Sequence, residues 1–253
     1  MVFKFSTEAR TLLDIPTDPK QFVQDADALV GNVESSWKKH KTYTYKLDDG
    51  SKESVTTYGT NLNGEYWLSR VSSHAEKTFA FDKMAKYLLG ADKTESGEYS
   101  VIDLYKHTEY ETDYIHVLSK WDKVPLESYD EFAKIADDTH LKRWASIRAE
   151  YELGAPLTTR EFNEFIMIVE PGYINDCGYV IQLVSNRVTS TGHVKGVYCS
   201  IERIRKVGDE VEWIMCTCSD SGGNVPKWLQ NSMISKSVAA DVPSFLNWVK
   251  RQK

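Results

Sequence analysis

The spacing of hydrophobic and polar residues changes several times along the chain, and each spacing predicts a different kind of element. Between Pro19 and Val30 the apolar residues recur at helical intervals, which predicts an amphipathic helix. The stretch "KTYTYKLDDGSKESVTTYGT" then gives two strand-like runs around Asp49-Gly50, a dipeptide typical of a tight hairpin. "GEYWLSRVSSH" follows and predicts a third strand.

The middle of the chain returns to helical spacing, and the second half alternates again. From Phe79 to about Leu118 the pattern is helical, interrupted by the polar stretch around residues 90–98, which we interpret as a loop or insertion. Five later segments are rich in β-branched and aromatic residues. The turns between them are too short for helical crossovers, so these strands should pair antiparallel. The five segments are "WASIRAEYEL", "TREFNEFIMIVEP", "GYVIQLVSNRV", "VKGVYCSIERIRK" and "EVEWIMCTCSD".

The C-terminal segment predicts one long amphipathic helix. Helical spacing resumes after Gly223, and Asn224 is placed to cap the new helix. Pro243 lacks a backbone donor, so we expect a kink or break near Asp241. Strands framed by helices in this order predict an α+β fold with one curved antiparallel sheet.

Composition limits the possible classes of protein. The 253 residues, 41% hydrophobic and 27% charged, suit one substantial core, and no repeat or long linker divides them. We therefore expect a single domain over residues 1–253, with its core at about 19–250. A net charge of -6 disfavours nucleic acid as a partner. The absence of an apolar leader or membrane-span pattern predicts a cytoplasmic protein.

Reactive side chains do not form a recognisable catalytic or metal-binding pattern. Four cysteines are too few for a disulfide scaffold, and neither they nor the six histidines have the spacing of metal ligands. Ser221 lies in "DSGG", which resembles the surroundings of the trypsin-like protease serine, but the histidine and carboxylate partners have no counterpart. We interpret this stretch as a strand-to-helix turn, and we expect neither a metal, nor a cofactor, nor enzyme activity.

Three motifs between Ala145 and Val249 occur in the order and spacing of one known family. "LGAPLTTREF", "VKGVYCSIERI" and "SDSGGNVPKWLQN" resemble, in turn, a conserved turn, a long strand and the start of the last helix in START domains. Upstream, "EYWLSRVSSH" is similar to a stretch in fungal START-like proteins. The resemblance implies the helix-grip fold, in which a long C-terminal helix crosses the concave face of a curved antiparallel sheet.

The same resemblance assigns cavity-facing residues on three strands and at the start of the last helix. Glu164 and Arg203 would then be charges on apolar faces, so they would pair with each other or hold a lipid head group between them. The alternative is the opposite strand register, which would place these charges in solvent. The implied cavity residues are Ile147, Ala149, Tyr151, Phe162, Glu164, Ile166, Cys199, Ile201, Arg203 and Trp228.

The function implied by the resemblance is lipid binding and lipid transfer. We expect a monomer that holds one lipid, a phospholipid or a sterol, and that touches membranes transiently. Two alternatives remain open from the sequence. One is a chaperone cofactor or adaptor with a filled core, because fold alone does not establish a ligand. The other is a helix-grip cyclase or hydrolase in which Glu164 and Tyr151 do acid-base work.

Overall fold

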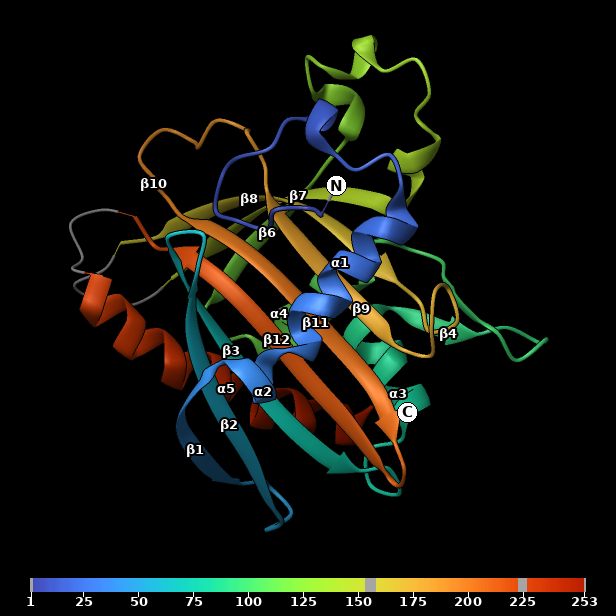
Figure 1. Cartoon of the computed structure of the whole chain (residues 1–253), viewed down its shortest axis with the longest axis vertical. Coiled ribbons are helices and arrows are strands. Elements are labelled where there is room, and N and C mark those ends of the chain that lie inside the picture. The colour runs from blue at the N-terminus through green and yellow to red at the C-terminus, as the bar shows by residue number, and fades with distance from the viewer. Residues whose placement is uncertain (1, 153–157, 223–226, 253) are drawn as a thin grey trace.

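A large antiparallel sheet dominates the computed structural model, which describes residues 2–152, 158–222 and 227–252 and, for 227–233, the backbone alone. Within these residues the strand order is β1-β2-β3-β12-β11-β9-β8-β7-β6, and the short β10 pairs parallel with β8 (Figure 1). The sheet strands are β1 Lys38–Lys46, β2 Lys52–Leu62, β3 Glu65–Ala75, β6 Leu118–Val124, β7 Trp144–Tyr151, β8 Arg160–Val169, β9 Gly178–Val184, β10 Val194–Lys195, β11 Val197–Val207 and β12 Glu210–Asp220. The predicted α+β fold is confirmed.

The predicted hairpin connects β1 and β2. Gly50 takes a positive φ of 86°, which favours glycine, and the backbone N–H of Leu47 donates to the carbonyl of Ser51 at 2.8 Å. Asp49 supports the turn by accepting from the Ser51 backbone N–H at 2.9 Å. The turn therefore fixes the register of the first two strands.

The first helix, α1 Pro19–Gly31, covers one side of the sheet, called the outer face here. Asp18 caps α1 by accepting from the backbone N–H of Gln21, and the buried side chains of Phe22 and Ala26 belong to one apolar cluster with strand residues. In Figure 1, α1 crosses the near side of the sheet over β11 and β12. The outer-face strand residues of this cluster include Phe165, Met167, Ile181, Leu183, Ile214 and Cys216.

The last helix, α5 Lys227–Arg251, covers the opposite side, called the inner face. It contains Pro243 without interruption, so the break that was one of the two expectations near Asp241 does not occur, and the other, a kink, stays a prediction. Val242 and Phe245, on either side of the proline, are fully buried, and their packing offsets the roughly 3 kcal/mol that an interior proline costs. The expected cap, Asn224, lies outside the described residues.

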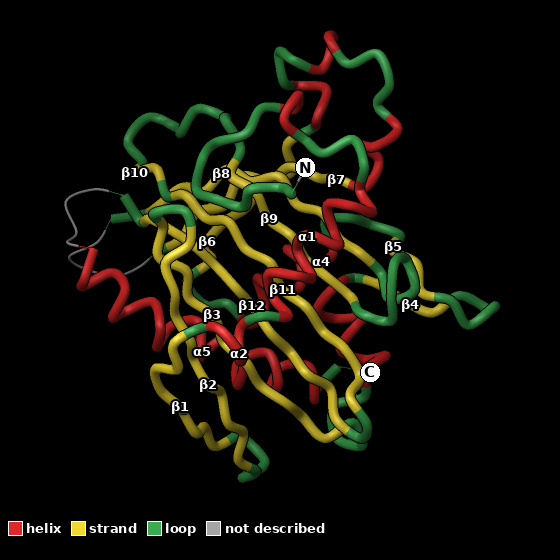
Figure 2. The backbone as a smooth tube through the Cα atoms, in the orientation of Figure 1, coloured by secondary structure: helices red, strands yellow, loops and turns green. Residues whose placement is uncertain are grey.

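The middle of the chain supplies the other walls of the inner face. α3 Phe81–Met84 continues into a π-helical turn, Ala85–Leu89, and α4 Lys106–Tyr114 follows. The polar stretch at 90–98 contributes to a small hairpin of β4 Ala91–Lys93 and β5 Tyr99–Val101, which projects from the sheet (Figure 2). No helix among the described residues is long and apolar enough to span a membrane.

The remaining segments pack on the outer face. Between β6 and β7 lie three 3-10 turns, Leu126–Ser128, Phe132–Lys134 and Thr139–Arg143. The hydroxyl of Tyr129 bonds to the hydroxyls of Ser146 and Ser185 at 2.7 and 2.8 Å, which ties this segment to the sheet. The N-terminal residues, which include the 3-10 turn Leu12–Asp14, add further apolar side chains to the same cluster: Phe5, Leu12 and Ile15.

Candidate functional site

A cavity of about 160 Å³ lies between the inner face of the sheet, α4 and α5. Known ligand pockets for drug-sized molecules measure about 300–1,000 Å³, so this cavity is small. Beside the cavity, the aromatic side chains of Trp213, which also lines it, Phe245 and Trp248 pack closely against one another. The described residues that line the cavity are Arg70, Glu111, Tyr114, Ile115, Val117, Tyr151, Phe162, Glu164, Gln182, Tyr198, Glu202, Trp213, Met215, Ile234, Ser237, Val238 and Asp241.

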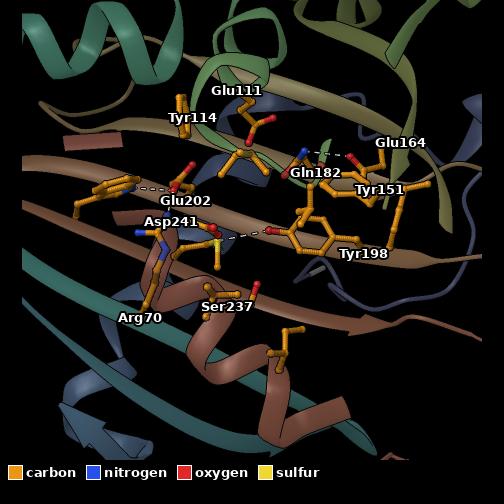
Figure 3. A pocket seen from close by; sticks show the side chains of 17 residues that line it. Arg70, Glu111, Tyr114, Tyr151, Glu164, Gln182, Tyr198, Glu202, Ser237 and Asp241 are labelled. Atoms are coloured by element: carbon orange, nitrogen blue, oxygen red, sulfur yellow. Dashed lines mark hydrogen bonds and ion pairs between the residues drawn. The ribbon is translucent and has the colours of Figure 1, made fainter. Parts of the chain in front are cut away.

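Four carboxyl groups from four different elements line this cavity (Figure 3). Glu111 belongs to α4, Glu164 to β8, Glu202 to β11 and Asp241 to α5. Strand alternation brings Glu164 and Glu202 to the inner face, and the helices supply the other two from the opposite wall. The described residues contain no group of three or more potential ligands arranged to hold a metal ion.

The only basic side chain in the described lining is Arg70 of β3, which is 3% exposed. Its Nη2 donates to Glu202 Oε1 at 2.6 Å, and Trp213 Nε1 donates to the same oxygen at 2.7 Å. The guanidinium lies over the Trp213 ring, 4.1 Å from its centroid. Within the described residues, Nε and Nη1 of Arg70 have no hydrogen-bond partner. Two buried donors of this cavity-lining residue thus lack an acceptor among the described residues.

Burial makes Glu164 a weak acid. Removal from water, together with the charge of Glu111, raises its pKa to about 8, although the side-chain amide of Gln182 opposes this by donating to Glu164 Oε2 at 3.0 Å. The carboxyl is therefore mostly protonated at neutral pH in the empty cavity, where it can donate a hydrogen bond as well as accept one.

Burial also acts on the carboxyls of Asp241 and Glu111, and the pKa of each is raised. Burial raises the pKa of Asp241 to about 7; the charge of Arg70 lowers it, and the charges of Glu111 and Glu202 raise it. Burial also raises the pKa of Glu111, against the lowering effect of His107. His107 lies one helical turn before Glu111 on α4, with its Nε2 3.5 Å from Glu111 Oε2. The cavity wall thus carries more carboxyl groups than basic groups, and burial favours the protonated form of three of them.

Six of the sequence-predicted residues lie on the inner face. Tyr151, Phe162 and Glu164 line the cavity itself. Three more, Ile147, Ala149 and Ile166, belong to the apolar cluster that packs beneath α5. Contact of any of these residues with a lipid stays a prediction.

The placement predicted for β11 is wrong by one residue. Cys199 and Ile201 belong to the outer cluster under α1, and Arg203 donates from Nη1 to Asp27 of that helix at 2.7 Å. The residues of β11 that face the cavity are instead Tyr198 and Glu202. Because side chains alternate along a strand, Arg203 cannot face Glu164, and the proposed pair between them does not exist.

The remaining predicted residue, Trp228, belongs to α5, where only the backbone is described at this position. The sequence analysis missed most of the polar lining, including Arg70, Glu111, Glu202 and Asp241. The inward position of Asp241 could have been predicted, since it lies within one turn of several apolar residues on the α5 stripe. The inward position of Glu111 could not, because its helix is polar along most of its length.

Two serines, Ser221 and Ser72, bear on the enzyme alternative. Ser221 follows β12, and its backbone carbonyl accepts from Arg160 Nε at 2.7 Å, in agreement with a structural turn. A Ser-His-acid connectivity does occur elsewhere: Ser72 Oγ lies 2.9 Å from His74 Nε2, and His74 Nδ1 lies 2.8 Å from Glu53 Oε2. Ser72 is 3% exposed and is not among the described cavity residues.

Comparisons with known proteins agree with the fold. The family model described as "Protein of unknown function (DUF3074)" matches residues 67–249. Human StAR-related lipid transfer protein 5 superposes with a TM-score of 0.61 at 9% identity, covering 92% of this chain and 95% of that one. Human STARD10 gives 0.59 at 10% identity, covering 93% and 80%. The human StarD13 lipid transfer and protein localization domain gives 0.52 at 12%, covering 90% and 96%.

No curated protein matches the sequence. At identities this low, the structural matches establish the START fold and leave the ligand open. The resemblance inferred from the sequence motifs is confirmed at the level of fold.

Proposed function

The chain belongs to this DUF3074 family and has the fold of a START domain, and we propose that it binds one amphipathic lipid at a time in the cavity under α5 and carries it between membranes. The observation that supports this proposal is the mixed lining of that cavity. Apolar side chains such as Phe162, Met215 and Val238 share it with buried polar groups. A ligand suited to such a wall has an apolar part and a polar part.

The energy of binding would come from the lipid tail, and specificity from the head. Each methylene removed from water contributes about 0.8 kcal/mol. The polar groups would select the head, because a buried donor or acceptor without a partner costs about 1–3 kcal/mol. Arg70 presents two such donors.

The size of the cavity implies that the protein must open to take up a whole lipid. About 160 Å³ is close to the volume of an engineered cavity of about 150 Å³ that holds benzene, so it suits a head group and the first carbons of a tail. Ile115 and Val117, between α4 and β6, line the cavity, and Val117 is 39% exposed. We place the opening at this loop, where the lining reaches the surface.

We take the protein to be a binder rather than an enzyme. The Ser72, His74 and Glu53 side chains have the connectivity of a hydrolytic triad, but Ser72 lies outside the described cavity lining and is buried. A nucleophile needs space for the reacting carbonyl beside it. A hydrogen-bonded structural network accounts for the same contacts.

Native mass spectrometry and lipid extraction of the purified protein test the proposal, followed by a vesicle-to-vesicle transfer assay with the extracted lipid class. Val238→Trp places an indole in the cavity and should abolish both co-purification and transfer. Lys236→Trp adds the same side chain at an exposed position of α5 and should leave both unchanged.

Two results would contradict the proposal. Lipid bound equally by the Val238→Trp variant would place the binding site elsewhere. A parent protein that neither co-purifies with nor transfers any lipid would favour the filled-core adaptor, an alternative consistent with the small volume of the cavity.

A further inference from the structure

The charges around the cavity are unbalanced. Four carboxyl groups and one guanidinium line it, and the guanidinium of Arg70 already donates to Glu202. Burial raises the pKa of the other three carboxyls, and an anionic head group would favour their protonated forms further. A cationic head can instead form an ion pair with each carboxyl that gives up its proton. The wall therefore favours a cation.

Aromatic rings provide a second reason for a cation. The described lining includes Tyr114, Tyr151 and Tyr198, in addition to Trp213, over whose ring Arg70 already lies. Ring faces attract ammonium groups, and this attraction is strongest where water is excluded. Carboxylates combined with aromatic rings are therefore suited to hold an ammonium group.

Arg70 favours a ligand that also has a hydrogen-bond acceptor, which a simple amine in its ammonium form lacks. Its side chain is 3% exposed and lines the cavity, and its Nε and Nη1 lack partners within the described residues (Figure 3). These atoms donate only, so the complementary ligand atom is an oxygen. A neutral hydroxyl supplies that acceptor without adding a negative charge.

We propose that the ligand is a single-chain amino alcohol, whose ammonium lies beside Glu164 and Glu111 and whose hydroxyl accepts from Arg70. This inference rests on the proposed lipid-binding function and specifies its ligand. The cavity of about 160 Å³ accommodates the amino-alcohol head, and the opening proposed at Val117 would admit the tail into the protein. A single tail requires less opening of that loop than two tails do.

Binding of the ammonium should release a proton. Glu164, whose pKa is raised to about 8 by burial, is mostly protonated at neutral pH in the empty protein. The ligand enters as an ammonium, and the carboxyl loses its proton to solvent to form the ion pair. Affinity should therefore rise with pH between about 6 and 8, while the amine stays charged. The groups that face the site are Arg70, Glu111 with His107 behind it, Tyr114, Tyr151, Glu164, Tyr198, Glu202 and Asp241.

The test compares head groups on one saturated chain. Sphinganine, octadecylamine, octadecanol and octadecanoate are titrated into the purified parent by calorimetry near neutral pH. Sphinganine should bind most tightly and octadecylamine next; each should exceed octadecanol by about tenfold or more, the ratio that about 1.4 kcal/mol provides. Octadecanoate should bind most weakly.

A charge-removing variant then checks the site. Glu164→Gln keeps the shape of the side chain and should lose at least about tenfold in sphinganine affinity, with little change for octadecanol. It should also lose most of the increase in affinity with pH. Glu95→Gln makes the same change at an exposed position near the β4–β5 turn and should match the parent.

The outcomes separate this inference from the function on which it rests. Octadecanol or octadecanoate binding as tightly as sphinganine would overturn the amino-alcohol assignment and leave lipid binding intact. Equal loss of all ligands in Glu164→Gln would show that the carboxyl is only structural. Failure of the parent to bind any of the four probes or to co-purify with lipid would overturn both proposals.

Discussion

Both faces of the sheet bury an arginine among carboxyl groups, but the outer arginine has more carboxylate partners than the inner one. On the outer face, Arg203 donates from Nη1 to Asp27 at 2.7 Å and from Nη2 to Glu212 at 2.9 Å. Arg205 adds two further hydrogen bonds to Glu212. On the inner face, Arg70 has one carboxylate partner, and two of its nitrogens lack a partner among the described residues, against one, Nε, in Arg203. Two fixed carboxylates thus hold the outer arginine, and one holds the inner arginine.

The pKa values show the physical consequence. Burial acts to raise the pKa of Glu212, but the hydrogen bonds and charges of Arg205 and Arg203 outweigh it and lower that pKa. Burial raises the pKa of Glu164 to about 8, and no cation opposes it. Burial acts in the same direction on both carboxyls, and the two arginines beside Glu212 reverse its effect. Glu164, which lacks such a cation among the described residues, is the carboxyl that can take one from a ligand.

The largest effect is expected at the outer arginine. Arg203→Met leaves Asp27 without its cation and removes one of two arginines from Glu212, which should reduce the free energy of unfolding by about 3–5 kcal/mol. Urea denaturation measures it. Arg205→Met, at a 42% exposed side chain, is the control and should cost much less. Equal losses in the two variants would show that burial of Arg203 is irrelevant.

The next effect concerns the pH dependence of stability on the inner face. Because the folded-state pKa of Glu164 is raised, its contribution is full at low pH and is lost as pH rises towards about 8. Between about pH 5 and pH 8 the parent should lose roughly 3 kcal/mol relative to Glu164→Gln. Chemical denaturation across this range measures the difference. Parallel curves for the two proteins would mean that Glu164 is ionised and solvated.

Glu212→Gln should behave in the opposite way and with smaller amplitude. The folded-state pKa of Glu212 is lowered, so its contribution is present above the unfolded pKa and is lost as pH falls through the folded pKa. The variant should be less stable than the parent by about 2 kcal/mol at neutral pH, and the gap should close in acid. A gap that widens in acid would contradict the contrast between the faces.

The smallest effect is expected at Ser72. Ser72→Ala removes a hydrogen bond to His74 and should cost about 1 kcal/mol while leaving lipid transfer unchanged. A fluorophosphonate probe should label neither Ser72 nor Ser221. Stoichiometric labelling of either serine would show that an accessible nucleophile exists and would reopen the enzyme alternative.

The sequence was sufficient where only one face of an element is apolar. On β7, Arg148 and Glu150 are half-buried on the outer side and alternate with Ile147 and Ala149 of the inner face, so the pattern agrees with the placement that the family resemblance implied. The helix α1 and the β1–β2 hairpin were predictable for similar local reasons, namely a capped apolar stripe and a glycine turn. Local patterns of this kind specify both the element and its orientation.

On β11, the local sequence pattern did not determine which residues face the cavity, and the tertiary structure did. The strand is covered by α1 on one side and lies over the inner-face cavity on the other, so Cys199 and Tyr198 are equally plausible inward residues from the sequence. Two buried faces leave no polar side to mark the register. The carboxyls that converge on the cavity come from α4, β8, β11 and α5, separated by up to 130 positions between Glu111 and Asp241. The amino-acid sequence thus predicted most of the sheet strands and both covering helices, but not β6 or the β4–β5 hairpin, while the packing of helices on both faces decided which charges became paired and which face the cavity.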